Sequence, residues 1–113
     1  MNMEWILEDG ISSKQVQTVE DIASAVRGVM NRTLDFLILT PSEPIMACNF
    51  MQAASSGKEK IRLEVSFVQP SGANRLYYTE CSPDLAICLL TLYYTEYAVP
   101  EISDLTFEGE YGG

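Results

Sequence analysis

The side chains that could do chemistry in this sequence are three cysteines and a set of carboxylates, and there is no histidine. The commonest general base and metal ligand is therefore missing, and neither a Ser-His-Asp nor a Cys-His nucleophile can be assembled. Cys48 and Cys88 lie in apolar stretches, which favours a structural role, and Cys81 follows the anionic Glu80, which makes a thiolate harder to form. The odd count, with no C-x-x-C pair, predicts reduced, buried thiols rather than a disulfide framework.

Paired carboxylates could supply the acid and base of a glycosidase-type reaction. Glu8-Asp9 and Glu20-Asp21 are adjacent in sequence, so their side chains diverge, and a turn and a helix cap explain them. Glu64, on the polar side of an expected strand, is the better catalytic candidate, although a solvated side chain is the simpler explanation. Because no EF-hand spacing, P-loop or GxGxxG occurs, the sequence predicts no catalytic residue, no cofactor and no metal site.

Acidic residues outnumber basic ones by sixteen to seven, which gives a net charge of −9. The imbalance is concentrated late in the chain, because residues 1–75 hold every base and residues 76–113 hold none. The acids of this second stretch are Glu80, Asp84, Glu96, Glu101, Asp104, Glu108 and Glu110. A field of this sign repels nucleic acid and anionic membranes and attracts basic partners. The alternative is that the charge only keeps a small protein soluble.

An antiparallel meander forms the centre of the expected fold. Three strands follow one another at residues 34–39, 45–54 and 60–68, joined by short connections built on Pro, Ser and Gly. Connections this short allow only antiparallel neighbours. Period-two alternation predicts further strands at residues 3–8 and 75–80. After the Asp9-Gly10 turn, residues 11–16 are expected to pair back as a ragged edge strand.

Two helices are expected. Thr18 is an N-cap, and Asp21 completes a capping box for a helix over residues 19–30 with one apolar stripe. Ser82 caps a second helix that runs to about Glu96 and is apolar almost all round. A helix of this kind is either sunk in the core or shared with a partner.

Together these elements predict an α+β fold in a single domain spanning residues 1–113. A mainly antiparallel sheet of five to six strands carries both helices packed on one face. Residues 105–107 are expected as a short edge strand and residues 108–113 as a flexible tail. The start of the sequence lacks the basic region of a signal peptide, and the longest apolar run, residues 85–94, is too short to cross a bilayer, so a cytoplasmic location is expected.

Three stretches share a pattern: residues 50–54, the acid-bearing strand at 63–65, and Tyr77-Tyr78-Thr79, which leads into a Ser-capped helix that ends in Tyr93-Tyr94. Together they resemble the small immunity proteins of bacterial polymorphic toxin systems. The early helix also fits the order of elements in such proteins, and the resemblance covers about residues 3–97. It implies an acidic protein that binds and blocks a cognate toxin without catalysis. It transfers no site residue, because these proteins contact different toxins through different surfaces.

The leading functional prediction is a non-catalytic, cytoplasmic binding protein that neutralises a basic protein partner such as a toxin. Acids take the place of phosphates, and tyrosines, which give large contact area at low entropy cost, act as anchors. The predicted partner-binding residues are Glu80, Asp84, Glu96, Glu101, Asp104, Tyr77, Tyr94 and Tyr97. Neither nucleic acid nor membrane is expected as a partner.

Two alternatives remain open at this point. The first is a homodimeric structural or adaptor domain in which the apolar second helix packs across a two-fold axis and buries Leu90, Tyr94 and Tyr97. The second is an enzyme that uses carboxylates, which would require an apolar pocket with two converging carboxylates of raised pKa.

Overall fold

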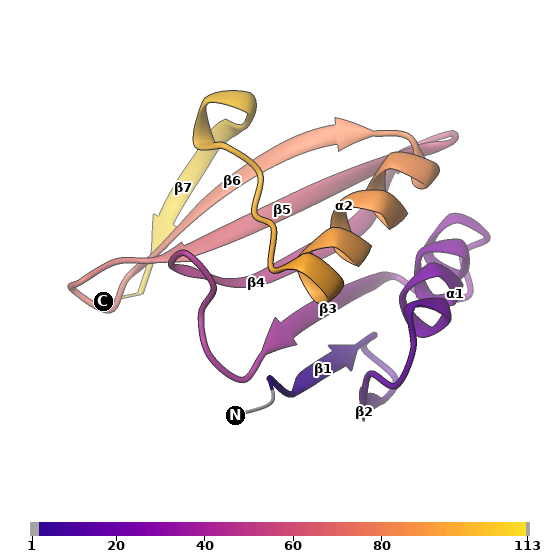
Figure 1. Ribbon diagram of the computed structural model, residues 1–113. Helices are drawn as coiled ribbons and strands as arrows, with labels where there is room; N and C mark the ends of the chain where they lie inside the picture. The colour runs from indigo at the N-terminus through magenta and orange to yellow at the C-terminus, as the bar shows by residue number, and fades with distance from the viewer. Residues whose placement is uncertain (1–2, 113) are drawn as a thin grey trace.

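Two helices and a seven-stranded sheet make up the part of the chain that the computed structural model describes, residues 3–112 (Figure 1). The helices are α1 (Val19–Met30) and α2 (Pro83–Glu96), with a short 3-10 helix, η1 (Ile102–Asp104). The strands are β1 (Trp5–Glu8), β2 (Ser13–Gln15), β3 (Phe36–Pro41), β4 (Cys48–Gly57), β5 (Lys60–Val68), β6 (Asn74–Cys81) and β7 (Thr106–Tyr111). They form one antiparallel sheet in the order β2-β1-β3-β4-β5-β6-β7.

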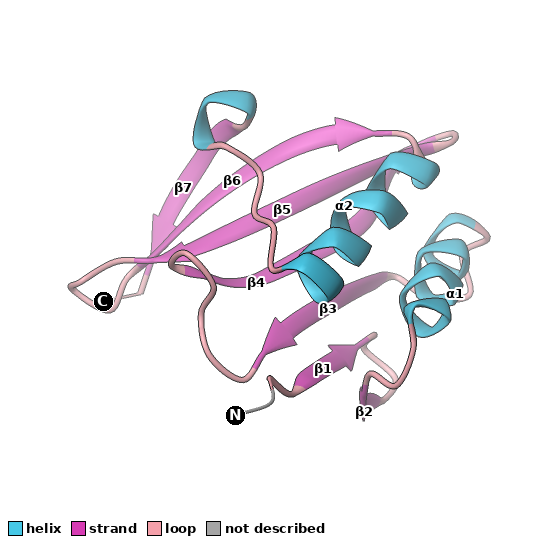
Figure 2. Cartoon of the chain, in the orientation of Figure 1, coloured by secondary structure: helices cyan, strands magenta, loops and turns pink. Residues whose placement is uncertain are grey.

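Both helices lie on the same face of this sheet, and no described helix covers the other face (Figure 2). Helix α1 packs against β3 and β4, α2 packs against β5, and the two helices contact each other. The predicted α+β fold is thereby confirmed, with one strand more than the five to six expected. Within residues 3–112, no helix has the length and apolarity needed to cross a lipid bilayer.

Helix α1 has the predicted bounds and the predicted cap. The carboxylate of Asp21 accepts hydrogen bonds from the backbone N–H of Gln17 at 2.8 Å and of Thr18 at 3.1 Å. These two hydrogen bonds hold the pKa of Asp21 below its ordinary value. Ile22, the next residue, and Val26, one turn further on, are completely buried, so the cap fixes the start of the helix and the apolar stripe fixes its face.

Helix α2 buries only a narrow strip of its apolar surface. The hydroxyl oxygen of Ser82 accepts a hydrogen bond from the N–H of Leu85 at 3.1 Å, as expected of an N-cap. The buried residues are Ala86, Leu90 and Tyr93. The exposed apolar residues include Leu85, Cys88 and Leu92. Helix α2 was predicted to be either buried in the core or shared with a partner. One side of it is buried, and an apolar stripe on the other side is exposed to solvent.

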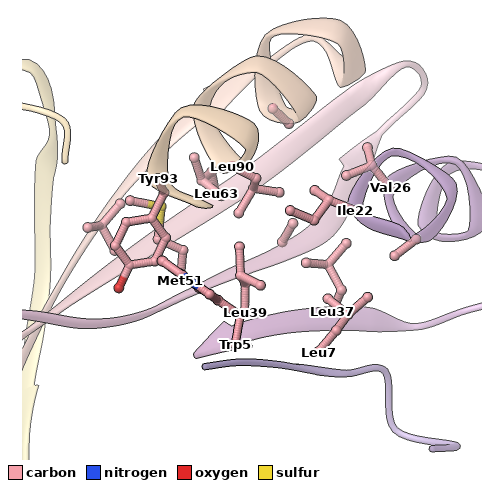
Figure 3. Packing of buried hydrophobic residues seen from close by; sticks show 14 of the residues in the cluster. Trp5, Leu7, Ile22, Val26, Leu37, Leu39, Met51, Leu63, Leu90 and Tyr93 are labelled. Carbon is pink, nitrogen blue, oxygen red and sulfur yellow. The ribbon is translucent and has the colours of Figure 1, made fainter. Parts of the chain in front are cut away.

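The core fills the space between the helices and the covered face of the sheet (Figure 3). Tyr93 reaches into it from α2, and its hydroxyl donates a hydrogen bond to the carbonyl oxygen of Cys48 at 3.0 Å. The ring of Trp5 on β1 meets the ring of Tyr93 edge-on, with centroids 4.9 Å apart. These contacts tie three separate elements together in a dry interior.

The strand predicted from residue 45 begins instead at Cys48, because residues 45–48 form a tight reverse turn. The backbone N–H of Ile45 donates to the carbonyl of Cys48 at 2.9 Å, and the reverse bond measures 2.8 Å. Both central residues have positive φ, 49° at Met46 and 69° at Ala47. This is the φ pattern of a type I′ turn, which normally selects Asn-Gly rather than Met-Ala.

The flexible tail predicted at residues 108–113 is wrong for the part of it that the structure describes, which excludes residue 113. Residues 106–111 form β7, paired with β6 along the edge of the sheet. Arg62 on β5 binds the carboxylate of Glu108 at 2.9 Å, and Arg75 on β6 binds that of Glu110 at 2.7 Å. These ion pairs join strand β7 to bases far away in the sequence.

We expect Tyr93→Phe to lower the free energy of unfolding by about 1 kcal/mol, because it removes one buried hydrogen bond while the Cys48 carbonyl keeps its bond from Ile45. Urea unfolding of the variant and the wild type would measure the difference. Tyr94→Phe is the matched control, since the Tyr94 hydroxyl makes no hydrogen bond among residues 3–112. Equal effects of the two substitutions would contradict this role for the Tyr93 hydroxyl.

Candidate functional site

The predicted partner-binding acids fall into two groups at opposite ends of α2. Glu80 and Asp84 lie at its beginning, whereas Glu96, Glu101 and Asp104 follow one another from its last turn into η1. The 14 residues of α2 span about 20 Å at 1.5 Å per residue. That is more than twice the ~8 Å Debye length of physiological salt, so the two groups do not act as one patch.

The predicted tyrosines also divide. Tyr77 is half-buried between Phe67 and Phe107, with ring centroids 5.6 and 5.4 Å away, and Tyr94 is half-buried against Trp5 at 5.5 Å. Both therefore serve packing within the monomer. Tyr97 lies directly after Glu96, and its ring centroid is 6.3 Å from that of Trp5. It is 48% exposed and is the most exposed tyrosine of the predicted set.

The three acids at and beyond the C-terminal end of α2, which we call the α2-end acids (Glu96, Glu101 and Asp104), are all exposed. Glu96 occupies the last turn of the helix, which contains no basic residue. The negative end of the helix dipole makes an acid there unfavourable by roughly 0.3–1 kcal/mol. Among residues 3–112 none of the three forms an ion pair, in contrast to Glu108 and Glu110. Their charge is thus uncompensated within the monomer.

A cavity of about 380 Å³ lies next to one of these acids, Glu101, between the segment after α2, the turn at residues 45–48 and the end of β5. Its apolar wall includes Met46, Ala47, Phe67, Pro100 and Ile102. The charged residue in the lining is Glu101. Met46 is 75% exposed and Ile102 48% exposed, so part of the apolar wall is open to solvent.

The turn at residues 45–48 supplies one wall of the cavity and is held firmly. The carbonyl of Ala47 accepts a hydrogen bond from the N–H of Val68 at 2.8 Å, and the carbonyl of Cys48 accepts one from the buried Tyr93. The positive φ values of Met46 and Ala47 cost about 1–3 kcal/mol each for residues with a Cβ. Backbone strain of this kind persists where its surroundings enforce it, and it concentrates at functional sites.

A second group of polar side chains lies on the uncovered face of the sheet. The guanidinium of Arg62 stands 3.6 Å from the centre of the Tyr78 ring and contacts Glu108 at 2.9 Å and Glu64 at 4.0 Å. Burial, and then the hydrogen bond and charge of Glu108, raise the pKa of Glu64 to about 7. The same hydrogen bond lowers the pKa of Glu108. The sequence identified Glu64 but missed Glu108, because that residue was assigned to a tail.

This carboxyl pair meets only part of what an enzyme would need. Glu64 and Glu108 do converge, and one of them has a raised pKa, but they sit on an open sheet face beside an arginine. Of the other paired acids, Asp9 accepts hydrogen bonds from the N–H groups of Ile11 and Ser12 in a turn, and Asp21 caps α1. The geometry of these two aspartates is explained by backbone capping.

The cysteines are free thiols with different surroundings. Cys48 is completely buried, and burial raises the pKa of its thiol to about 11. Burial also raises the pKa of the Cys81 thiol. Cys88 was predicted to be buried but is exposed, because it lies on the outer side of α2.

Comparison of the chain with protein-family models, with curated proteins and with solved structures found no match. The resemblance to immunity proteins therefore stays a prediction from the sequence.

The raised pKa of Glu64 makes stability depend on pH in a defined direction. The folded protein keeps this proton up to about pH 7, whereas the unfolded chain releases it near the ordinary value of 4.5. The stabilisation from Glu64 is therefore complete below about pH 4.5 and is lost as the pH rises through 7. We expect urea unfolding to show a loss of stability between pH 5 and pH 8 that is absent in Glu64→Gln.

Glu43→Gln, a substitution in the loop between β3 and β4, is the control and should keep the wild-type pH dependence. If Glu64→Gln loses as much stability between pH 5 and pH 8 as the wild type, the pKa of Glu64 is not raised in the folded protein.

Proposed function

We propose that this chain is a non-catalytic binding protein that neutralises a basic protein partner, in the manner of an immunity protein that inhibits a cognate toxin. The observation that carries the proposal is the uncompensated charge of the α2-end acids. Glu96 stands at the negative end of a helix dipole, and Glu101 and Asp104 follow it in the chain; none of the three forms an ion pair among residues 3–112. A cationic partner would relieve this repulsion.

The mechanism is steering followed by occlusion. The negative field of the α2-end acids attracts a cationic surface and raises the rate of encounter. Contact with Tyr97 and with the apolar wall that includes Met46 and Ile102 then holds the complex, since burial of aromatic and apolar surface supplies most binding energy at hot spots. The partner's active surface is covered rather than chemically altered.

The same electrostatics limit the kinds of partner. The field that attracts a basic protein repels nucleic acid and anionic membranes, so we propose neither as a partner. Free thiols at Cys48, Cys81 and Cys88 fit a reducing compartment, and we propose a cytoplasmic protein.

A homodimer is the second candidate, because α2 leaves an apolar stripe exposed. Leu85, Cys88 and Leu92 are exposed at spacings of three and four residues and share one side of the helix. Leu90 was predicted to lie in such an interface, but it is completely buried in the monomer. Antiparallel packing of two α2 helices would also bring Asp84 of one copy near Glu96 of the other, and this like-charge contact opposes a tight dimer.

For the proposed function, we expect the gene next to the one for this chain to encode a basic, growth-inhibiting protein. Coexpression of the wild-type chain should restore growth, and the triple variant Glu96→Gln, Glu101→Gln, Asp104→Asn should not. The association rate constant of the purified pair should fall about tenfold in the triple variant and fall steeply with salt.

The matched control is Glu80→Gln with Asp84→Asn, at the other end of α2, which should rescue growth like the wild type. The proposal would be contradicted if the product of the neighbouring gene were not toxic, if the triple variant restored growth fully, or if the association rate constant did not change with salt.

Sedimentation equilibrium decides the homodimer alternative. We expect a monomer at micromolar concentration, because the stripe on α2 is flanked by acids and contains no base. A dimer that Leu85→Ser and Leu92→Ser together convert to a monomer would favour the structural or adaptor role instead.

A further inference from the structure

We infer that the cavity next to Glu101 is an anchor pocket for an apolar side chain that is followed or preceded by a lysine or arginine in the partner. The inference rests on the proposed function only in taking the partner to be basic. It identifies the cavity as the part of the surface that decides specificity, and it specifies the type of sequence that the partner must present there.

The size and lining of the cavity fit a short segment that carries an apolar side chain together with its neighbour. Its volume of about 380 Å³ lies at the lower end of the range of ligand pockets, roughly 300–1,000 Å³. Phe67 and Val68 from the end of β5 form one side, and Val99 and Pro100 from the segment after α2 form another. Met46 and Ile102 stand at the rim with much of their apolar surface in water. An apolar occupant would bury these side chains and gain the free energy of removing them from water.

The charge at the pocket selects the neighbour of that apolar residue. Glu101 belongs to the lining, and no Lys or Arg does. Because Glu101 is exposed, its carboxylate can pair with a cationic group next to an apolar occupant. An occupant that was only cationic would leave the apolar side chains of the wall exposed to water. A segment that carries both groups side by side satisfies the whole lining.

The pocket is built before the partner arrives. The turn at residues 45–48 is fixed by the hydrogen bonds from Val68 to Ala47 and from Tyr93 to Cys48. Its φ pattern favours Asn-Gly, yet the chain has Met46 and Ala47 in these positions, so the turn presents an exposed methionine in place of the less strained alternative. Methionine is flexible and polarisable and adapts well to apolar partners. Preorganisation of the wall lowers the entropy cost of binding.

The test is a selection of random eight-residue peptides displayed on phage against the immobilised full chain. Enriched sequences should place Leu, Ile, Met or Phe next to Lys or Arg. Titration of the best peptide should then show a Kd about tenfold higher for the double variant Met46→Asn, Ala47→Gly and several-fold higher for Glu101→Gln. The double variant should also melt several degrees above the wild type because the strain is relieved, so its loss of binding cannot come from misfolding.

Ile11→Asn is the matched control, since Ile11 is 79% exposed against 75% for Met46 but lies in the β1–β2 turn. Its Kd for the peptide should stay within about twofold of the wild type. Three results would overturn the anchor pocket: enrichment of basic peptides without an adjacent apolar residue, equal binding of the peptide to the Met46→Asn, Ala47→Gly variant and the wild type, or no enrichment at all. None of them bears on the proposed function, which the coexpression experiment tests separately. Enrichment of acidic peptides would overturn both.

Discussion

The hydroxyl of Tyr93 donates a hydrogen bond to the carbonyl oxygen of Cys48, and the arrangement of the candidate surface depends on this contact. The donor is a completely buried side chain of α2, and the acceptor is the last residue of the turn at 45–48. The bond therefore joins the helix that carries Glu96 to the turn that presents Met46. Trp5 packs edge-on against the same ring and brings β1 into the contact. Because the interior is closely packed, the acids and the cavity wall keep a fixed relation to each other.

Charge is distributed unevenly over the molecule for a structural reason. The acidic last third of the chain contains no base of its own, and the arginines that reach it, Arg62 and Arg75, both pair with acids of β7. Those ion pairs hold the edge strand to the sheet. The α2-end acids receive no such partner among residues 3–112, and one of them stands at the wrong end of a helix dipole. The strained turn at Met46 and Ala47 and the exposed carboxylate of Glu101 line the same cavity.

The elements that could be predicted from sequence are those with local signals. The capping box at Thr18 and the alternation of β5 gave correct bounds because a few neighbouring residues determine them. The turn at Met46-Ala47 could not be predicted, because it lacks the Asn-Gly signature and is enforced by contacts with distant residues. For the same reason β7 was expected only at residues 105–107: the continuation of the strand includes Glu108, which is held by Arg62, and the carboxyl pair of Glu108 with Glu64 was missed with it. Counting charges in the sequence located the acidic last third of the chain. It did not reveal that α2 separates the acids at its two ends, or that Tyr77 and Tyr94 are half-buried.

The central claim is that the surface potential is most negative at the end of α2, and it can be measured without a partner. Two nitroxide probes of equal size, one cationic and one anionic, enhance the relaxation of each backbone amide proton in proportion to their local concentrations. We expect the ratio of cationic to anionic enhancement to be largest for residues 96–104, and to fall there when Glu96, Glu101 and Asp104 are neutralised. A ratio at residues 96–104 no larger than at residues 80–84, or one unchanged by the neutralisation, would contradict the account.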